Sequence, residues 1–455
     1  MSLDDYVLGF VMAGGRGSRL KILTRDRCKP AIDILGHYRI LDFVATNIVN
    51  TGIPVMLIAA QFEPGSLSAH AGNGSIWGLG RANGKLEIIS PHKSGKRFVT
   101  FEGTADSVRK SAAQINRYSP DIVLVLAADH IYTMDYKDAI MYHKSHNADI
   151  TIMTNAVPDS KVSSLGIVKI DESGRITDFA EKPTDEKVIE RFRLSDRMKS
   201  VLGIDDPNLN FLASMGNYIF FWNRLKKLLE LPGVDFARHI IPAIKERQGT
   251  LYAYVFNGYW RDIGRIRDYF DCSMDFACDT LPIDLWKHRV RRSQEYPSCT
   301  WVSAGASTNG VILSCGDVIH RGSVVTDSVM GTQVAVEERC KLDHCVFLGA
   351  DRNEFRNNTI TRKYTTNIGK NSNLSYVILD KNVWIGEGVE ISPNNGTPEQ
   401  RGEILQSAGL EPYRELDDGT VEGDFYIEPE MGILVIGKQY GADPRKPILP
   451  NGLKC

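Results

Sequence analysis

Residues 13–30 read AGGRGSRLKILTRDRCKP, and the fold of the first half follows from this stretch. Residues 6–12, directly before it, are mostly apolar and rich in β-branched and aromatic side chains, which predicts a short buried strand. Because glycine has no side chain to keep a ligand away, backbone N–H groups in the turn after this strand can approach phosphate oxygens closely. We therefore expect a strand that leads into a phosphate-binding turn, whose nucleotide-binding residues are Gly14, Gly15 and Gly17.

Positive charge follows the glycine turn. Arg16, Arg19 and Lys29 lie close behind it in sequence, and a transferred phosphoryl group carries several negative charges that such cations stabilise. We expect Arg19 and Lys29 to act in catalysis. The glycine spacing matches neither GxGxxG nor GxxxxGK[ST], so it supports neither a dinucleotide-binding fold nor a P-loop.

Further buried strands are expected in the first half of the chain. Residues 54–60, 121–127 and 149–153 are short apolar runs, and the last two follow helix-like stretches at 105–118 and 136–146. Apolar runs that alternate with helices indicate a parallel sheet covered on both faces, which is a doubly wound α/β domain. Ligands bind such sheets at the carboxyl ends of the strands, so the residues just after each strand should carry the chemistry.

The pattern changes near residue 281. Residues 281–297 contain two prolines and a basic run, which is typical of a linker. Beyond it, apolar residues recur at every sixth position: Ile312, Val318, Val324, Met330, Val336, Leu342 and Leu348. This period fits neither a helix nor a flat amphipathic strand and is typical of a hexapeptide β-helix, although a set of ordinary short strands stays possible. The polar residues 351–364 are expected to leave the coil as a loop.

The chain is therefore divided into a catalytic domain at residues 1–280, a linker at 281–297 and a β-helix domain at 298–455.

A resemblance to a known family supports the same division. Residues 13–30 closely resemble the signature of the sugar nucleotidyltransferase superfamily, and within it the ADP-glucose pyrophosphorylase branch. Matching motifs continue in the expected order, at residues 38–53 (YRILDFVATNIVNTGI), 103–106 (GTAD), 128–132 (ADHIY), 134–136 (MDY), 179–183 (FAEKP), 213–218 (ASMGNY), 240–242 (IIP) and 259–264 (YWRDIG).

The resemblance covers roughly residues 7–276 and extends into the β-helix. It implies a Rossmann-like nucleotidyltransferase domain followed by a left-handed parallel β-helix. It also assigns a Mg²⁺ ion to Asp129 and Asp262. Asp129 follows the expected strand at 121–127, where a metal-binding carboxylate should lie. Taken alone, either aspartate would fit a helix cap or a turn equally well.

The resemblance further implies the substrate contacts. Lys182 becomes a ligand of the sugar phosphate and a catalytic cation, and Pro183 is expected to hold its backbone extended. The other sugar-phosphate-binding residues implied are Gly166, Glu181 and Ser214. The residues implied beside the nucleobase are Gly103, Thr104 and Ala105.

The activity implied is that of a glucose-1-phosphate adenylyltransferase, which converts ATP and glucose 1-phosphate to ADP-glucose and pyrophosphate for glycogen or glucan synthesis. Three alternatives stay open: another nucleotide or sugar 1-phosphate, a non-catalytic regulatory subunit, and a bifunctional acetyltransferase. The last lacks a clear acetyl-transfer histidine, because His320 and His344 are expected at the surface. The resemblance also implies a homotetramer.

Two departures bear on specificity and regulation. Asp26 stands where bacterial members of the branch often carry a basic residue linked to activator binding. Residues 62–97 keep Ser66, Leu67 and His70 of the branch pattern but lose its Gly-Trp continuation, and this region borders the expected nucleotide and sugar pockets. The reaction class is thus better specified than the base, the sugar or the effector.

The composition excludes several classes of protein. Lys and Arg total 54 against 56 Asp and Glu, so no strongly basic surface for nucleic acid is expected. No apolar run approaches the roughly 18 residues of a membrane span, and the acidic start does not resemble a signal peptide. The 8 cysteines include no CxxC pair, which favours reduced thiols in a cytoplasmic protein over a zinc site.

Overall fold

The computed structural model describes residues 5–80, 84–94, 97–291, 299–350, 366–417, 420–439 and 447–455. The chain packs into two compact units. Met1–Gly15 and Phe43–Trp260 form the N-terminal unit, and Arg16–Asp42 and Arg261–Cys455 form the C-terminal unit. Residues 16–42 thus pack with the second half of the chain, a grouping that local sequence pattern does not indicate. The expected domain boundaries at 280 and 298 stay a prediction.

A mixed sheet forms the centre of the N-terminal unit. Within the described residues, its strands are β1 (Val7–Ala13), β4 (Val55–Ala60), β5 (Lys85–Ile89), β8 (Ile122–Ala127), β10 (Ile150–Pro158), β11 (Gly166–Ile170), β12 (Ile176–Glu181), β13 (Leu209–Phe221) and β14 (Leu251–Phe256). They lie in the order β12-β11-β13-β8-β1-β4-β5, with β10 beside β13 and β14. β1 pairs in parallel with β4 and β8, and β5 pairs in parallel with β4. The expected doubly wound α/β fold is confirmed.

The sheet departs from a purely parallel arrangement at β13. This strand runs antiparallel to β8, β10 and β11, and β11 in turn forms a hairpin with β12. The Ala127 N–H donates to Asn217 Oδ1 at 2.8 Å, which fixes the middle of β13 beside the end of β8. Residues of β13 therefore reach the ligand-binding edge of the parallel strands.

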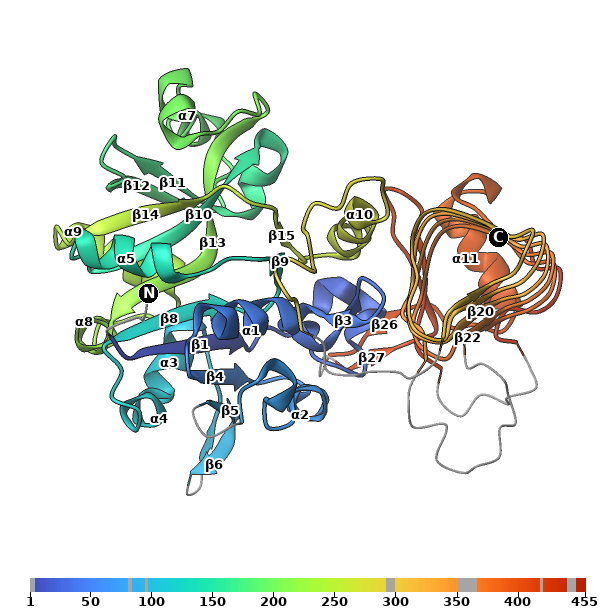
Figure 1. Ribbon diagram of the computed structural model, residues 1–455, viewed down its shortest axis with the longest axis horizontal. Coiled ribbons are helices and arrows are strands. Elements are labelled where there is room, and N and C mark those ends of the chain that lie inside the picture. Colours follow the sequence, from blue (N-terminus) through green and yellow to red (C-terminus); the bar gives the residue numbers. More distant parts are fainter. Residues whose placement is uncertain are drawn as a thin grey trace. The chain divides into compact units, whose positions relative to one another are not determined.

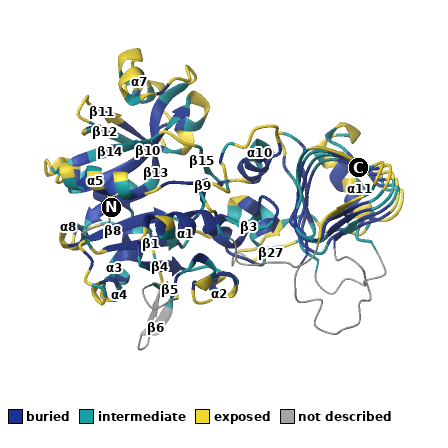
Figure 2. Cartoon of the chain, viewed as in Figure 1, coloured by how far each residue is buried: buried dark blue, intermediate teal, exposed yellow. Residues whose placement is uncertain are grey.

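Short helices cover the sheet (Figure 1). They are α1 (Ile40–Thr51), α2 (Pro64–Ala71), α3 (Thr104–Lys110), α4 (Ala112–Asn116), α5 (Lys137–Ser145), α6 (Glu186–Glu190), α7 (Asp196–Leu202), α8 (Trp222–Leu228), α9 (Ile241–Glu246), and the 3₁₀ and π segments η3 (Ser75–Trp77), η4 (Asp159–Ser164) and η5 (Phe236–Ile240). α3 packs on β1, and α5 packs on β10, β13 and β14. The expected helix at 105–118 is two helices that meet at Ser111, and the helix expected at 136–146 is α5. Figure 2 shows that the central strands are buried along most of their length.

Shorter strand pairs complete the described elements outside the β-helix. Their strands are β2 (Asp33–Ile34), β3 (Tyr38–Arg39), β6 (His92–Ser94), β7 (Arg97–Val99), β9 (His130–Tyr132), β15 (Trp260–Asp262), β26 (Arg414–Glu415) and β27 (Val421–Glu422).

The C-terminal unit contains a parallel β-helix. One of its sheets holds β16 (Trp301–Val302), β18 (Val318–Ile319), β20 (Val334–Val336), β22 (Thr366–Ile368) and β24 (Trp384–Ile385). A second sheet holds β17 (Ser307–Ile312), β19 (Val324–Met330), β21 (Lys341–Phe347), β23 (Asn373–Leu379), β25 (Glu390–Ile391), β28 (Phe425–Ile427) and β29 (Leu434–Ile436). Successive coils pair in parallel register, as the stacked strands of Figure 1 show. The predicted β-helix is confirmed.

The six-residue period is only approximate in the structure. Equivalent positions on successive coils lie 17 residues apart, as the bond from the Val334 N–H to Asp317 Oδ1 illustrates. Each coil consists of three turns, so one of these turns has five residues instead of six. The phase of the pattern slips as a result. Val324, which belongs to the six-residue series, is 40% exposed, whereas its neighbour Val325 is fully buried.

Residues 16–42 pack on the β-helix through buried ion pairs. The Arg27 guanidinium lies 2.8 Å from Asp380, and the Lys381 ammonium lies 2.9 Å from Asp33. Burial raises the pKa of Asp33, but Lys381, Arg39 and Arg27 together hold it well below its ordinary value. Opposite charges that are buried together are stable only when they are paired, so this network fixes the segment in place.

Within the described residues, the helical segments of the C-terminal unit are η1 (Ser18–Thr24), η2 (Lys29–Ala31), α10 (Ile266–Phe276), the 3₁₀ turn η7 (Pro393–Asn395) and α11 (Pro398–Ser407). α10 packs its apolar side on β19 and β21. Of the expected linker, residues 281–291 form neither helix nor strand and 292–297 lie outside the described residues. The loop expected at 351–364 also lies outside them.

Candidate active site

The turn after β1 is open. A Cβ atom added to Gly14 or Gly15 would meet nothing within 4 Å. The fold itself therefore does not require glycine at these two positions. Open space in front of backbone N–H groups, at the carboxyl end of a parallel strand, is what a phosphate group needs to approach the chain.

Gly17, the third glycine of the motif, is required by the fold. It has φ +72°, and an added Cβ would lie 3.0 Å from Thr24 and 3.1 Å from the Cβ of Lys29. Only glycine combines this left-handed conformation with such a close approach. Gly17 therefore folds the segment back on itself and brings its two ends together.

The same segment brings Lys29 beside Asp262. The Lys29 ammonium is 3.6 Å from the Asp262 carboxylate, with only 7% of the lysine side chain exposed and 30% of the aspartate. Pro30 follows directly in η2 and fixes the backbone next to the buried lysine. At Gly264, a Cβ atom would lie 3.6 Å from both the Arg19 guanidinium and Asp262. The structure thus brings together Arg19, Lys29 and Asp262 within the C-terminal unit.

Asp129 lies directly after β8, at the carboxyl end of a central parallel strand of the N-terminal unit, as expected. Its carboxylate is 34% exposed and lies 3.4 Å from His130 Nε2. Partly exposed carboxylates are the hard oxygen ligands that Mg²⁺ prefers, so the donor chemistry of Asp129 and Asp262 fits this ion. Asp262 belongs to the C-terminal unit, whereas Asp129 belongs to the N-terminal unit. Each carboxylate alone has the chemistry of a Mg²⁺ ligand, and a single Mg²⁺ site shared by both stays a prediction.

Gly103, Thr104 and Ala105, the residues expected beside the nucleobase, lie at the start of α3. An added Cβ at Gly103 would lie 2.4 Å from the carbonyl oxygen of Val234, so only glycine fits there. Thr104 Oγ1 donates to Asp235 at 3.0 Å and accepts from the Phe236 N–H at 3.0 Å. These bonds fix the start of α3 against the segment that precedes η5.

Asp235 was missed by the sequence analysis. Besides Thr104, it accepts the Arg238 N–H at 3.1 Å and so caps η5. It also lies close enough to Glu181 to act on the pKa of that carboxyl group. An aspartate at the N-cap, followed by the apolar run at 240–241, was the available signal for this residue.

Gly166 and Glu181 face each other across the β11–β12 hairpin. An added Cβ at Gly166 would lie 2.6 Å from Glu181 Oε2 and 3.0 Å from the Phe179 ring. Burial raises the pKa of Glu181, an effect that the neighbouring Lys182 opposes and Asp235 strengthens. A half-buried carboxylate of this kind can accept hydrogen bonds from sugar hydroxyls.

Lys182 does not have the expected extended backbone. Its φ is +49°, in the left-handed region, because its N–H bonds back to the carbonyl oxygen of Leu165 at 3.1 Å. Pro183 disfavours only the right-handed helical region at the residue before it, so the restraint was real but the inferred conformation was wrong. The ammonium group lies 3.8 Å from Glu181 and the side chain is 47% exposed, which leaves it accessible to an anionic ligand.

Ser214 is another residue that is expected to bind the sugar phosphate. It lies on β13, is 9% exposed, and its Oγ accepts the Gly216 N–H at 3.2 Å. Tyr218 of the same strand is buried, which raises the pKa of its hydroxyl, and Asp235 and Glu181 raise it further. The N-terminal unit therefore brings together Gly166, Glu181, Lys182, Ser214 and the nucleotide-side residues around Thr104.

The two histidines that are expected at the surface, His320 and His344, belong to the β-helix. His344 is half-buried, bonds to Asp343 at 2.9 Å and stacks on Tyr376, while His320 packs edge-on against Trp301. These contacts account for both side chains. All eight cysteines are free thiols.

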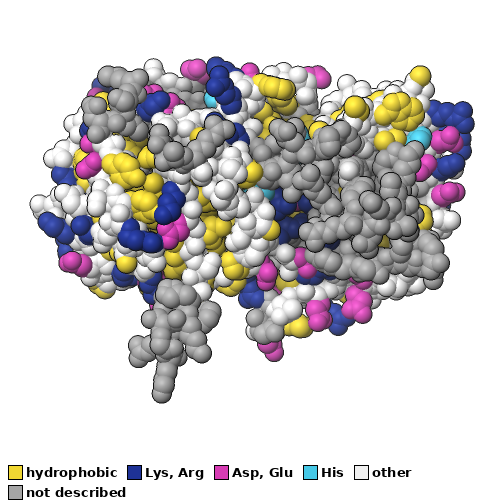
Figure 3. All heavy atoms as spheres, turned by 60° about the horizontal axis from the view of Figure 1, so that its bottom comes forward, with side chains coloured by type: hydrophobic (Ala, Val, Ile, Leu, Met, Phe, Trp, Pro, Cys, Tyr) yellow, Lys and Arg dark blue, Asp and Glu magenta, His cyan; other side chains and the backbone are white. Residues whose placement is uncertain are grey.

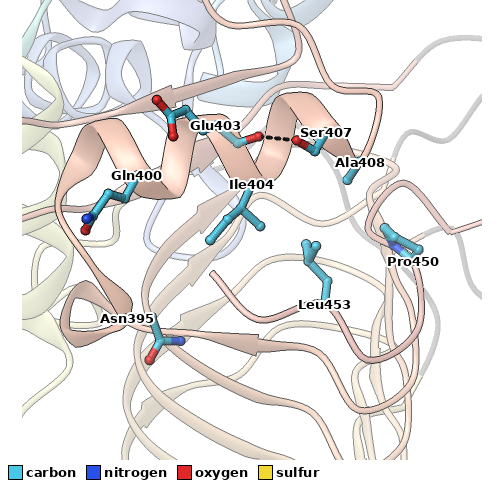
Figure 4. A pocket seen from close by; sticks show the side chains of 8 residues that line it. All are labelled: Asn395, Gln400, Glu403, Ile404, Ser407, Ala408, Pro450 and Leu453. Atoms are coloured by element: carbon cyan, nitrogen blue, oxygen red, sulfur yellow. Dashed lines mark hydrogen bonds between the residues drawn. The ribbon is translucent and has the colours of Figure 1, made fainter.

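An open groove lies on the C-terminal unit beside α11 (Figure 4). It encloses about 760 Å³, and Ile404 of α11 and Leu453 near the chain end contribute apolar side chains to it. None of the predicted site residues lines it. On the face drawn in Figure 3, acidic and basic side chains are interspersed among the coloured atoms. No helix in the described part of the chain combines the length and the apolar content needed to cross a bilayer.

Comparison with known proteins decides the family. The sequence model of nucleotidyl transferases matches residues 8–278, and that of the GLGC left-handed parallel β-helix domain matches residues 299–407. A glucose-1-phosphate adenylyltransferase of Acetivibrio thermocellus is 31% identical over 448 residues, which are 96% of this chain and 93% of that protein. The chain belongs to the glucose-1-phosphate adenylyltransferase family.

Other members of the glucose-1-phosphate adenylyltransferase family are similarly related. The protein of Lachnospira eligens is 34% identical over 345 residues, which are 74% of this chain and 75% of that relative. The protein of Clostridium acetobutylicum is 37% identical over 286 residues, which are 62% of this chain and 70% of that relative. Every predicted site residue falls within the nucleotidyl transferase match, whereas residues 408–455 lie beyond the β-helix match.

Proposed function

We propose that the protein transfers the adenylyl group of ATP to glucose 1-phosphate, releasing pyrophosphate and forming ADP-glucose for glycogen or glucan synthesis. The observation that carries the proposal is the pairing of Lys29 with Asp262 beside Arg19. A buried lysine, an exposed arginine and a carboxylate of metal-ligand type are the groups that phosphoryl transfer needs at the triphosphate. Membership of the glucose-1-phosphate adenylyltransferase family supports the choice of substrates.

The chemistry needs charge and position more than proton transfer. The attacking phosphate oxygen of the sugar phosphate is already an anion, so no general base is required. The barrier comes from bringing two anions together, and Arg19, Lys29 and Lys182 lower it by stabilising negative charge as the transition state forms. Glu181 and Ser214 would orient the sugar on the side of the N-terminal unit.

We further propose that Asp129 and Asp262 hold Mg²⁺. When bound, the ion would neutralise part of the charge of the triphosphate. The Lys29–Asp262 ion pair would hold the Asp262 carboxylate in place before substrates bind.

The remaining alternatives concern specificity and role. Another nucleotide or sugar 1-phosphate would use the same residues, because the cations bind phosphate groups and do not distinguish one base or sugar from another. A non-catalytic regulatory subunit is less well supported, since Lys29, Asp129, Lys182 and Asp262 are all present and charged. Eight free thiols support a cytoplasmic location.

We also propose that the chain forms a homotetramer. Within the described residues, β16 and β17 lie at the ends of their sheets and pair on one side only. Trp301 and Val302 of β16 are 50% and 39% exposed, and Val324 of the next coil is 40% exposed. Exposed apolar side chains on an open sheet edge favour contact with another chain.

The first test is pyrophosphate release by the purified protein with glucose 1-phosphate, Mg²⁺ and each of ATP, UTP, GTP, CTP and dTTP. We expect turnover with ATP that disappears when EDTA removes the metal. The variant Asp129→Asn keeps the shape of the side chain but removes its charge, and should lower kcat by about 100-fold or more.

A matched control is Asp196→Asn, which changes an exposed aspartate at the start of α7 outside the site. Its kcat should equal that of the wild type. Turnover with another nucleotide would keep the mechanism and change the substrate. The absence of pyrophosphate release with all five nucleotides would contradict the proposal and favour a regulatory subunit.

A further inference from the structure

The segment that carries Arg19 and Lys29 has a strained backbone. Lys21, between them, has φ 53° and ψ −128°, a conformation that residues with a Cβ rarely adopt. Thr24 Oγ1 lies within hydrogen-bond distance of the carbonyl oxygens of Gly17 and Lys21, at 3.1 and 3.0 Å. Strained backbone of this kind persists only where neighbouring structure holds it.

Arg25 fastens the end of this segment to the C-terminal part of the chain. Its Nη1 donates to the carbonyl oxygen of Gly423 at 2.6 Å and its Nη2 donates to that of Lys438. Its Nε donates to Asp26 at 3.0 Å, which sets the orientation of the guanidinium group. The side chain is only 17% exposed. One planar group thus joins the segment to two separate points of backbone.

The partner region, which we name the C-terminal clamp, comprises residues 411–417 and 420–439. It lies beyond the β-helix family match, which ends at residue 407. The clamp approaches η1 very closely. An added Cβ at Gly437 would lie 2.5 Å from Cδ1 of the buried Ile22, so a larger residue at that position would have to displace either the Ile22 side chain or the loop.

The clamp also contacts the strained Lys21 and shares a cavity with Arg19. The Lys21 ammonium lies 5.0 Å from the centre of the Tyr413 ring and 5.8 Å from that of Tyr426. Arg19 and Tyr426 line the same cavity of about 200 Å³. The clamp therefore supports the segment at the strained residue, Lys21, and just after it, at Ile22 and Arg25.

We propose that Arg25 is a positioning residue for the transfer reaction: with the C-terminal clamp, it holds the segment so that Arg19 and Lys29 meet the triphosphate. This inference rests on the proposed function. Arginine suits this position because its planar fork presents two separate nitrogens to two carbonyl oxygens, whereas lysine offers a single nitrogen. Loss of the fork should free the segment while leaving the sugar-side residues of the N-terminal unit unaffected.

The test compares Arg25→Gln and Arg25→Lys with the wild type. We expect Arg25→Gln to lower kcat by roughly 10-fold and to raise the KM for ATP several-fold, with the KM for glucose 1-phosphate unchanged. The kinetic constants of Arg25→Lys should lie between those of Arg25→Gln and those of the wild type. A merely structural defect would reduce the active fraction and move neither KM, so the difference between the two KM values separates positioning from stability.

The matched control is Arg224→Gln. Arg224 also donates to two backbone carbonyl oxygens, those of Asn147 and Ala148, but lies outside the predicted site. It should leave kcat and both KM values unchanged. If Arg25→Gln does not fold, Gly437→Ala perturbs the clamp at a different contact, its close approach to Ile22, and it should change the kinetic constants in the same way.

Unchanged kinetics in a folded Arg25→Gln or Gly437→Ala would overturn the inference. So would a rise in the KM for glucose 1-phosphate equal to that for ATP. If the wild type turns over no nucleotide, the proposed function fails and hydrogen exchange tests the clamp separately. Faster exchange of amides 18–25 in Arg25→Gln than in Arg224→Gln would support the clamp, and equal exchange would refute it.

Discussion

Lys182 has a left-handed backbone conformation beside the half-buried Glu181. A lysine at φ +49° costs of the order of 1–3 kcal/mol relative to a relaxed backbone. The bond from its N–H to Leu165 and the adjoining hairpin hold it there. The result is an ammonium group fixed beside Glu181 with nearly half of its side chain accessible. This arrangement suits a group that binds an anion without having to reorganise.

Replacing Lys182 by glutamine tests this role. A charged hydrogen bond to a phosphate contributes roughly 1.5–3 kcal/mol, so Lys182→Gln should raise the KM for glucose 1-phosphate by about 10- to 100-fold. The KM for ATP should stay near the wild-type value, and steady-state kinetics measures both. Lys169→Gln, an exposed lysine on the adjacent strand β11, should change neither. Equal losses for the two substrates would argue against a sugar-phosphate ligand.

At the scale of single elements, α5 carries a buried histidine that makes the N-terminal unit sensitive to acid. His143 is fully buried and its Nδ1 lies 2.8 Å from Thr151 Oγ1 of β10. Burial lowers the pKa of His143 to about 3, with a further lowering from Arg224 and a small opposing effect of Asp149. The folded state therefore favours the neutral ring.

The pH dependence of stability follows from this shift. The unfolded chain protonates the histidine near pH 6.5, so the contribution of His143 is fully present above that pH and is lost as pH falls towards 3. Between pH 7 and 5 the loss should be about 2 kcal/mol. In His143→Gln the melting temperature should fall less over this range than in the wild type, as scanning calorimetry would show. His146→Gln, at the C-cap of the same helix, is the control, and identical slopes for all three proteins would contradict the argument.

At the scale of the whole molecule, the first coils of the β-helix suggest how chains associate. β16 has an unpaired edge within the described residues and carries the exposed Trp301. Trp301→Asp places a charge on this edge without disturbing a buried group. We expect it to shift the mass measured by light scattering from tetramer to smaller species, because a charge opposes burial in an apolar contact. Val201→Asp, at an apolar position 59% exposed on α7, should leave the mass unchanged.

An unchanged mass for Trp301→Asp would mean that subunits meet through another surface. A wild-type chain that measures as a monomer would exclude the proposed tetramer.

Much of the fold could be predicted from local sequence pattern. Strands 55–60 and 122–127 are apolar throughout and bounded by turns, so their burial depends on composition alone. The six-residue period identified the β-helix, even though each coil is one residue short of three full turns. β13 could not be placed in the same way, because its antiparallel direction depends on the hairpin beside it and not on its own residues.

The order of the motifs suggested the candidate site residues, and the apolar run before Asp129 placed that residue at the end of a strand. Asp235 was missed because its importance comes from a bond to Thr104, 131 positions away. The extended backbone expected for Lys182 was wrong because one long-range hydrogen bond outweighed a local preference. Contacts between distant residues are not encoded in any short pattern.

The sequence by itself determined the α/β fold, the β-helix, the family and the charged residues available for catalysis, because each leaves a local signature of period, turn or motif. Only the tertiary structure decided that residues 16–42 pack with the C-terminal unit, that Lys29 meets Asp262, and that Arg25 bonds to Gly423 and Lys438. These pairings depend on the path of the folded backbone through space, which brings together groups that are separated by hundreds of residues along the chain.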